Sequence, residues 1–534
     1  MAKQFFVLGI GGTGMRCIEA LIHLCAMGMF DNTDIHLLAL DTDKNNGNFS
    51  RLKEVKEAYV KTKGVEVSSR VALQDTFFSA NIKYYEFSPN YEQKSTFKDV
   101  FGYSDTQYNH SEETDLADLV LAKTVEEFNL RHGYRAQTHL GSMMMYHSII
   151  EAAKSPANND LKSFLGELAK QAQTGNPRVF ILGSVFGGTG ASSIPIIPQA
   201  ISKAAEIMTN GAVNVLKSAY FGSTLLTAYF SFKAPSSNEL ANQKVIATSD
   251  KFALNSQVAM MFYEDDSTVK STYQKFYMMG TDSLNWNPMA KDNISETITG
   301  GEKQKNDSHY IELLAASSAL SFYNEDESVL AVNKQNVKTD YEYRAINNNG
   351  KFDFQDFVGQ QRAEEFAKKF GLLIVFSLFC NGTDDFVESV RSGGVKEIQE
   401  FLDINVNQVL ALKEYFNLFF VRVNANGTLS EGWLKQIHRS AGGGDNFLFN
   451  ASLFSPSDLK SLMKLSWNKN LYRTEGIGKD NHYSTGLFGS KFDSFKKQFL
   501  LTRDKDSSWK NITNNGEQLN KLIYDTLSSL YNFK

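Results

Sequence analysis

A glycine-rich segment that follows a short apolar run is the feature that most constrains the fold. It reads GSVFGGTGASSIP from Gly183 to Pro195, after the apolar run Val179 to Leu182, and an apolar stretch able to form a helix comes next. Glycines let a backbone turn tightly and expose its N–H groups, and the start of a helix adds partial positive charge. The segment therefore predicts a phosphate cradle made of main chain. It is not a P-loop, because no Lys-Ser or Lys-Thr follows the glycines.

The composition is that of an ordinary globular protein. The chain has 534 residues, of which 42% are hydrophobic and 22% charged, and this length suggests roughly two to four domains. The formal net charge of -5 gives no support for nucleic acid or an anionic membrane as the main partner. No apolar run approaches the ~20 residues that cross a bilayer, so we expect neither nucleic-acid binding nor membrane insertion.

The cysteines and the N-terminus indicate a cytoplasmic protein. Cys17, Cys25 and Cys380 form no CxxC pair, which argues against a zinc site or a disulfide framework and favours reduced thiols in a cytosolic chain. The N-terminal sequence MAKQFFVLGIGGTG has a short apolar run that breaks at glycines. We interpret this run as a first strand and not as a signal peptide.

Strand and helix patterns alternate through the first part of the chain. Phe5 to Leu8 is a strand candidate, GIGGTG (Gly9 to Gly14) a turn, and Met15 to Met27 a helix, followed by a strand at His36 to Leu40. This β-α-β unit predicts a parallel sheet. Later strands are expected at 178–182, 213–221 and 275–279, and a central helix at 306–323. The fold class that follows is α/β, with a doubly wound parallel sheet.

The expected organisation has three parts. Residues 1–330 form the nucleotide-binding domain, with an insertion at about 44–132 over one edge that contains a strand at 82–87 and a helix at 115–130. Residues 331–455 form an α+β second domain, with strands at 341–345, 352–357 and 418–424. Residues 456–534 are a C-terminal extension whose last helix spans 516–531.

Three glycine-bearing turns lie at strand ends or helix starts, the edge at which open parallel sheets bind ligands. They are GIGGTG, GYRAQTHLG (Gly133 to Gly141) and GGTG (Gly187 to Gly190). Taken alone, GIGGTG leaves nucleotide binding and a plain tight turn equally open. With Asp41 after the second strand it also imitates the dinucleotide fingerprint of a Rossmann-type enzyme. That alternative leaves the other two turns unexplained.

Together these motifs resemble the tubulin/FtsZ superfamily, and most of all its divergent bacterial tubulin-like proteins. GGTGASSIP aligns without gaps to the signature GGTGTGAAP, and LLALDTD resembles the segment in which strand two ends in Asn-Thr-Asp, with Asp41 where the family has Asn. GYRAQTHLG has the length and outer glycines of the γ-phosphate loop GAGANPEVG. The motifs fall in family order and cover most of residues 1–330.

The resemblance implies a GTP/GDP site with Mg²⁺. An Asn-Asp pair meets guanine in the family, and a carboxylate suits its N1–H and N2–H donors, which favours GTP over ATP. The residues implied are Gly11, Gly12, Thr13 and Gly14 for the α- and β-phosphates, Gly187, Gly188, Thr189 and Gly190 for the β- and γ-phosphates, Thr42 and Asp43 near the metal-bound γ-phosphate, Arg135, Ala136 and Gln137 as its sensor, and Asn306 and Asp307 for guanine.

Two positions depart from the family pattern. Arg16 stands in the region where the first loop of FtsZ ends in asparagine. An arginine there can stack on the base or bind a phosphate, or it can be a surface residue at a helix start, and both readings stay open. Ser192 replaces the last glycine of the signature, which allows a looser approach of the backbone.

The resemblance also implies a mechanism of hydrolysis. In the family, acidic residues after the central helix act on the nucleotide of the next subunit, so hydrolysis requires polymerisation. Here the candidates are Glu325, Asp326 and Glu327, although the family's NxDxxD-type spacing is not reproduced and a solvated acidic turn is the alternative. The implied function is a GTPase activated by self-assembly into a head-to-tail homopolymer, and a further protein partner stays open. The alternative is a non-hydrolysing switch or scaffold subunit of a multi-protein system.

Overall fold

A large parallel sheet organises the molecule. The computed structural model describes residues 3–66, 73–102, 117–134, 137–232, 234–241, 248–281, 287–288, 300–344, 354–381, 406–420, 432–440, 491–505 and 508–530. Seven strands pair in parallel in the order β3-β2-β1-β4-β5-β7-β9. Their bounds are Lys3–Ile10 (β1), Thr33–Leu40 (β2), Asn81–Phe87 (β3), Arg178–Leu182 (β4), Tyr220–Leu226 (β5), Lys275–Met279 (β7) and Asp340–Arg344 (β9). The expected α/β class with a parallel sheet is confirmed.

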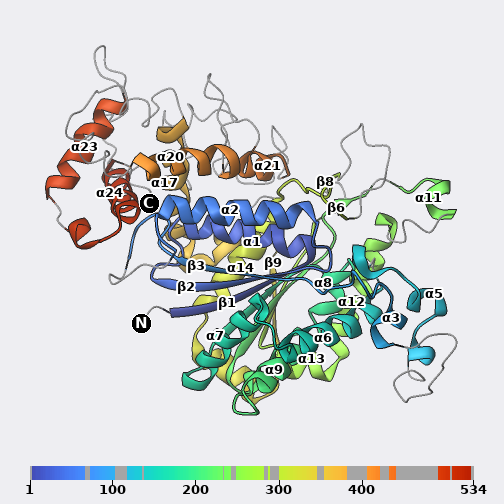
Figure 1. The fold of residues 1–534 in the computed structure, drawn as a ribbon. Coiled ribbons are helices and arrows are strands. Elements are labelled where there is room, and N and C mark those ends of the chain that lie inside the picture. Colours follow the sequence, from blue (N-terminus) through green and yellow to red (C-terminus); the bar gives the residue numbers. More distant parts are fainter. Residues whose placement is uncertain are drawn as a thin grey trace.

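Helices cover both faces of the sheet (Figure 1). One face carries α1 (Gly11–Ala26), α2 (Gly47–Lys63) and the central α14 (Tyr310–Asn324), and the other carries α6 (Thr138–Lys154), α7 (Asp160–Thr174), α9 (Ile197–Met208), α12 (Phe252–Asp265) and α13 (Ser267–Thr272). Successive strand side chains point to opposite faces. Accordingly, Phe5 and Val7 belong to one buried core, whereas Phe6 and Leu8 belong to the other.

The strand order places a switch point beside β1. From β1 the chain runs outward through β2 to β3, then returns to β4 on the other side of β1 and continues to β5, β7 and β9. In an open parallel sheet, the connections at such a point leave on opposite faces and open a crevice at the carboxyl ends of the strands. The carboxyl ends of β1 and β4 are therefore where a ligand site is expected.

The region expected as an insertion is in part a component of this sheet. Strand β3 pairs in parallel with β2, and α2 connects them. The single helix expected at 115–130 is wrong, because the described residues from 117 onward form separate helical pieces, among them α5 (Lys123–Glu126) and η1 (Leu130–His132). The strand expected at 213–221 starts only at Tyr220, because Asn214 caps the short helix α10 (Val215–Ser218) by accepting from the Lys217 N–H.

The C-terminal half also departs from expectation. The strand expected at 341–345 forms as β9, but it is an edge strand of the same sheet. The strand expected at 352–357 is wrong over the described part, which is helix α16 (Phe354–Val358), with its apolar side chains at helical spacing. Of the strand expected at 418–424, the described residues lie in the π-helical turn η5 (Phe416–Phe420), and 421–424 lie outside the described residues.

The remaining helices pack on the α1 side of the sheet. Side chains from α17 (Ala363–Asn381), α20 (Val406–Tyr415), α21 (Trp433–Ser440), α23 (Lys491–Lys505) and α24 (Asn515–Leu530) share one buried core with α1 and α14. Shorter elements are α3 (Phe97–Phe101), α8 (Thr189–Ser193), α11 (Ser237–Ala241), α15 (Glu327–Gln335), η2 (Ser249–Lys251), η4 (Gln360–Arg362), η6 (Ser508–Asn511), β6 (Phe230–Ser231) and β8 (Asn287–Pro288). The boundaries expected at 330 and 455 stay predictions.

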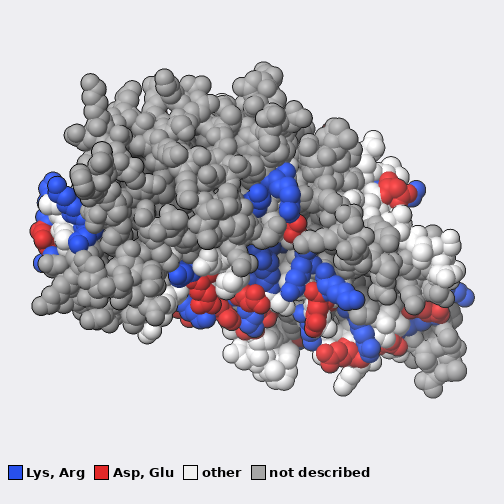
Figure 2. Space-filling view, turned by 90° about the horizontal axis from the view of Figure 1, so that it is seen from above, with Lys and Arg blue, Asp and Glu red and all other residues white. Residues whose placement is uncertain are grey.

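The surface shows mixed charge. Figure 2 shows basic and acidic side chains interspersed over the described part of one face. Among the described residues, Lys61 and Glu414 form an exposed ion pair, and pairs of this kind contribute little to stability. Among the helices of the described segments, none combines the length and apolarity needed to cross a membrane.

Candidate functional site

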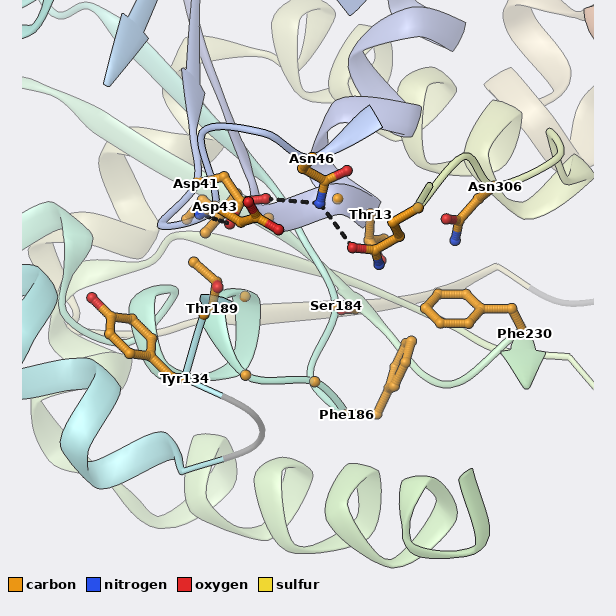
Figure 3. A pocket seen from close by; sticks show the side chains of 18 of the residues that line it. Thr13, Asp41, Asp43, Asn46, Tyr134, Ser184, Phe186, Thr189, Phe230 and Asn306 are labelled. Carbon is orange, nitrogen blue, oxygen red and sulfur yellow. Dashed lines mark hydrogen bonds between the residues drawn. The ribbon is translucent and has the colours of Figure 1, made fainter. Parts of the chain in front are cut away.

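A pocket lies at the carboxyl ends of β1, β2 and β4, where the sheet has its switch point (Figure 3). It contains about 810 Å³ of space that protein atoms do not fill, part of it open to solvent. The lining residues are Ile10, Gly11, Gly12, Thr13, Asp41, Asp43, Asn46, Gly133, Tyr134, Ser184, Phe186, Gly187, Gly188, Thr189, Gly190, Phe230, Phe232, Phe252, Gln304 and Asn306.

Two glycine-rich loops that are far apart in the sequence meet in this pocket. Residues 11–13 line it from the start of α1, and residues 187–190 line it from the loop after β4. Helix α1 begins at Gly11 without any side-chain cap, so the N–H groups of its first turn are open to a ligand. An anion is the natural partner for such groups, because the helix dipole adds positive charge at the same point.

Glycine is required at particular positions of these loops. Gly11 has φ +68°, which side chains other than glycine rarely adopt. At Gly190, a Cβ would lie 2.6 Å from the backbone oxygen of Ser184. Gly14 has a different role from the expected phosphate contact, since it does not line the pocket and its Cβ would lie 2.7 Å from the carbonyl oxygen of Leu182. Gly14 therefore allows α1 to pack closely on the sheet.

Two buried carboxylates form one end of the pocket. Asp41 and Asp43 both line it, and neither forms an ion pair with any described residue. Burial, and then repulsion from Asp43, raises the pKa of Asp41 to about 7. Thr42 does not line the pocket itself, but its Oγ1 lies 3.4 Å from Oγ1 of Thr189 and joins the end of β2 to the GGTG loop.

Aromatic rings form the opposite end (Figure 3). The ring centroid of Phe186 lies 5.3 Å from that of Phe230 and 4.8 Å from that of Phe252, and Phe232 packs beside them. The pocket thus joins a polar end, with glycines and carboxylates, to a flat apolar end. These phenylalanines were not predicted as site residues, because no sequence pattern separates them from the many that fill the core.

Of the two residues expected to contact guanine, Asn306 and Asp307, only one lines the pocket. Asn306 lines the pocket, and its contact with guanine stays a prediction. Asp307 does not, because its carboxylate accepts from Nε2 of Gln436 at 3.1 Å and pairs with Arg439. Helix α21, which carries both partners, was not foreseen as a neighbour of this loop.

Arg16 is neither a pocket residue nor a surface residue, so both readings of it are wrong. It is 1% exposed, forms an ion pair with Glu19, hydrogen-bonds Ser308, and places its Nε 3.6 Å from Glu312 of α14. Burial lowers the pKa of Arg16, but Glu19 and Glu312 raise it and the net shift is upward. Burial raises the pKa of Glu312 to about 7, although Arg16 opposes the shift. The side chain is covered because α14 packs directly on α1.

The third loop reaches the pocket in its described part. Gly133, with φ +84°, and Tyr134 both line it, and the hydroxyl of Tyr134 lies 3.1 Å from that of Tyr91. Arg135 and Ala136 lie outside the described residues. Gln137 precedes α6 as its N-cap and does not line the pocket.

The acidic triplet, Glu325 to Glu327, lies at the end of the sheet opposite the pocket. Oε2 of Glu325 is 2.5 Å from Nζ of Lys275, and Glu327 accepts from Nδ2 of Asn176 at 3.0 Å. Arg178 donates to backbone oxygens of this turn, at 2.7 Å for Glu325. Lys275 and Arg178 begin β7 and β4, so the triplet is at the amino ends of the strands and cannot reach the pocket of its own chain.

Neither a metal cluster nor a relative identifies this site. Within the described segments, no group of three or more His, Cys, Asp or Glu side chains is placed to hold a metal ion. No protein-family model matches the chain, and no curated protein matches it either.

Proposed function

We propose that this chain is a tubulin/FtsZ-like protein that binds GTP and hydrolyses it on head-to-tail assembly. The observation that carries the proposal is the meeting of two glycine-rich loops, from the ends of adjacent strands β1 and β4, in one pocket with an aromatic end. A dinucleotide enzyme would explain the first loop, but it gives no reason for the second.

The polar end of the pocket suits a nucleotide triphosphate together with a divalent cation. Backbone N–H groups at Gly11 to Thr13 and at Gly187 to Gly190 are available to phosphate oxygens. Asp41 and Asp43 would repel an anion by themselves, so these acids favour a bound cation between them and the phosphates. Mg²⁺, when bound, would supply that charge, and carboxylate and hydroxyl oxygens are ligands it accepts.

Hydrolysis is assigned to the contact between subunits. A heterologous head-to-tail contact repeats indefinitely when it does not close into a ring. If the amino ends of the strands in one copy stack on the carboxyl ends in the next, the exposed Asp326 and Glu327 of the first copy come to the pocket of the second. A carboxylate there would orient water and accept its proton as the bond to the γ-phosphorus forms and the bridging bond breaks, which releases GDP and phosphate.

One observation favours a second candidate, a nucleotide-binding switch without hydrolysis. The carboxylate of Glu325 is engaged by Lys275, which leaves fewer acids free to act on a neighbouring copy. Phosphate release per chain, measured across protein concentrations, separates the two candidates. A steep rise with concentration supports assembly-coupled hydrolysis, whereas stoichiometric GTP binding with no turnover supports the switch.

Two measurements test the main proposal. Nucleotide released from the purified protein by acid would be identified by chromatography, and sedimentation would be compared with GTP, with GDP and without nucleotide. We expect a guanine nucleotide and pelleting that depends on GTP. A protein that stays monomeric throughout and retains no nucleotide would overturn the proposal.

A further inference from the structure

Helix α12 carries apolar side chains on two opposite faces. Its inner face holds Phe252, which lines the pocket, and Tyr263, whose ring centroid lies 5.6 Å from that of Phe276 in β7. A helix that is apolar on all sides is normally buried. The outer side of α12 nevertheless has four large apolar side chains that are each between 47% and 58% exposed. These residues, which form the α12 face, are Leu254, Val258, Met261 and Phe262.

The α12 face is continuous and uncharged. Its residues follow one another at helical spacing, and the exposed residues beside them, Ala253 and Gln257, carry no charge. The whole stretch from 252 to 263 contains no charged residue. No other helix in the described ranges exposes more than two large apolar side chains. Single exposed hydrophobic residues are normal, whereas a contiguous patch of them marks a contact surface.

The charges at both ends of α12 have the wrong sign for an isolated helix. Lys251 is the N-cap residue, and the first turn contains no acid. The exposed Glu264 and Asp265 end the helix, and its last turn contains no basic residue. The helix dipole favours acids at the start and cations at the end. Asp250 lies outside the helix, 3.7 Å from Nζ of Lys251, and an exposed pair of this kind contributes little.

An antiparallel second copy of α12 would supply the missing charge at each end. If the two helices cross at Val258, residues at equal distances before and after this position face each other. Leu254 then lies opposite Phe262, four residues from the centre, and Lys251 lies opposite Asp265, seven residues from it. A two-fold interface requires a surface that is complementary to itself in this way.

We propose that the α12 face is a two-fold interface between two copies of this chain, with the helices antiparallel about Val258. A second copy accounts for the end charges as well as for the apolar stripe. Helix α12 runs from the pocket, at Phe252, toward the amino end of β7, at Tyr263. The interface therefore lies on the side of the subunit, apart from the ends that would stack head to tail, and it requires no nucleotide.

Cysteine cross-linking of the full chain without nucleotide tests the centre of the interface. The native cysteines are all buried and should give no background. In V258C the two introduced thiols meet across the two-fold axis, so oxidation should give a covalent dimer. The control V332C introduces a thiol on α15 at a valine that is about equally exposed, and this variant should stay monomeric under the same oxidation.

Two further cysteine variants test the direction of the helices. Residues 254 and 262 are about 12 Å apart along the helix, at about 1.5 Å a residue. L254C mixed with F262C should therefore give cross-linked dimers, whereas each variant alone should give few. Parallel helices would reverse this result, because each variant would then cross-link to itself, and such a reversal would overturn the proposal.

Sedimentation without nucleotide tests the apolar stripe and the charges separately. V258E should raise the Kd of the dimer at least about a hundredfold, because two carboxylates would meet at the centre, and the control V332E should leave it unchanged. K251D should raise the Kd about tenfold, since two symmetry-related pairs are lost. The exchange K251D/D265K should restore it to within about threefold. Thermal unfolding checks that each variant folds.

The results separate this interface from the proposed function. A chain that is monomeric at every concentration without nucleotide, or a dimer that V258E leaves intact, would overturn the two-fold interface. Neither result affects nucleotide retention or pelleting with GTP, by which the proposed function is judged. A chain that dimerises through α12 but retains no nucleotide and does not pellet would overturn the proposed function alone.

Discussion

The carboxylate of Asp41 accepts a hydrogen bond from Nδ2 of Asn46 at 3.3 Å, and this contact joins the charged end of the pocket to the side-chain amide of Asn46. The same carboxylate faces Asp43 at the end of β2. Burial and the charge of Asp43 raise its pKa to about 7. The ligand-free pocket is therefore strained electrostatically near neutral pH.

This strain predicts a pH-dependent loss of stability. The pKa of Asp41 is about 7 when folded and about 3.9 when unfolded, so between these values the folded state holds a proton that the unfolded state has lost. Stability from this group is therefore lost as the pH rises from about 4 to about 7, by at most about 4 kcal/mol. The D41N variant has no carboxyl at this position, so its stability should not fall in this way as the pH rises. Its gain in Tm over the original chain, without ligand, should be larger at pH 8 than at pH 5.

A bound cation should reverse the same shift. Positive charge beside Asp41 favours its ionised form, so binding of Mg²⁺ with nucleotide at pH 6.5, a pH chosen below about 7, should release a proton. Calorimetry in two buffers with different ionisation enthalpies measures that proton directly. An observed enthalpy that is equal in both buffers would contradict the expectation, and D41N serves as the variant that should release none from this position.

The glycines of the second loop should differ in their tolerance to substitution. At Gly190 an added methyl meets the backbone oxygen of Ser184 at 2.6 Å, whereas at Gly187 the nearest atom is Oγ of Ser184 at 3.8 Å. We expect G190A to lower Tm clearly and to abolish nucleotide binding, while G187A keeps the Tm of the original chain. Equal unfolding temperatures for the two variants would show that the loop does not need glycine at 190.

Much of this fold can be predicted from local sequence patterns, and the rest depends on tertiary contacts. Strands β4 and β7 fall where the apolar runs predict them, because a short run between turn residues is a local signal. Nothing local shows that β3 and β9 become the two edges of one sheet, since strand partners are chosen by packing. The edge position of β9 leaves Tyr341 and Tyr343 partly exposed, which resembles a strand of a separate small sheet when only the sequence is read.

The candidate site could likewise be predicted only in part from the sequence. Its glycine loops were predictable, because backbone turns of this kind restrict residue type. Asn46, Gln304 and Phe230 were not, since an amide or a ring in a loop has no pattern that separates a ligand contact from packing. Arg16 shows the reverse error. A helix that starts at Met15, as expected, would have Arg16 in its first turn, but α1 starts at Gly11 and Arg16 is a buried residue paired with Glu312 of α14.

Removing Arg16 should act on folding and not on ligand contacts. In R16L, Glu19 keeps Arg51 as a partner, at 2.9 Å, but Glu312 loses its only cationic neighbour among the described residues. Breaking a buried ion pair in this way costs about 3–5 kcal/mol, which urea unfolding would measure. The double variant R16L/E312L removes both charges and should recover part of that loss. A single variant as stable as the original chain would show that this cluster is not needed for stability.

The acidic turn between α14 and α15 should affect turnover without affecting binding. Asp326 caps α15 by accepting from the Ser328 N–H at 2.8 Å, and asparagine caps a helix about as well, so a D326N/E327Q variant should keep the Tm of the original chain. Its GTP affinity should also be unchanged, because both residues lie at the sheet edge opposite the pocket. We expect phosphate release at high protein concentration to fall at least about tenfold, since a positioned base contributes about that much or more. The variant E57Q, on exposed α2 surface, controls for loss of charge. Undiminished turnover in D326N/E327Q would remove this turn from the mechanism, while a rate that is lost together with GTP binding would mean that the substitutions act on the fold.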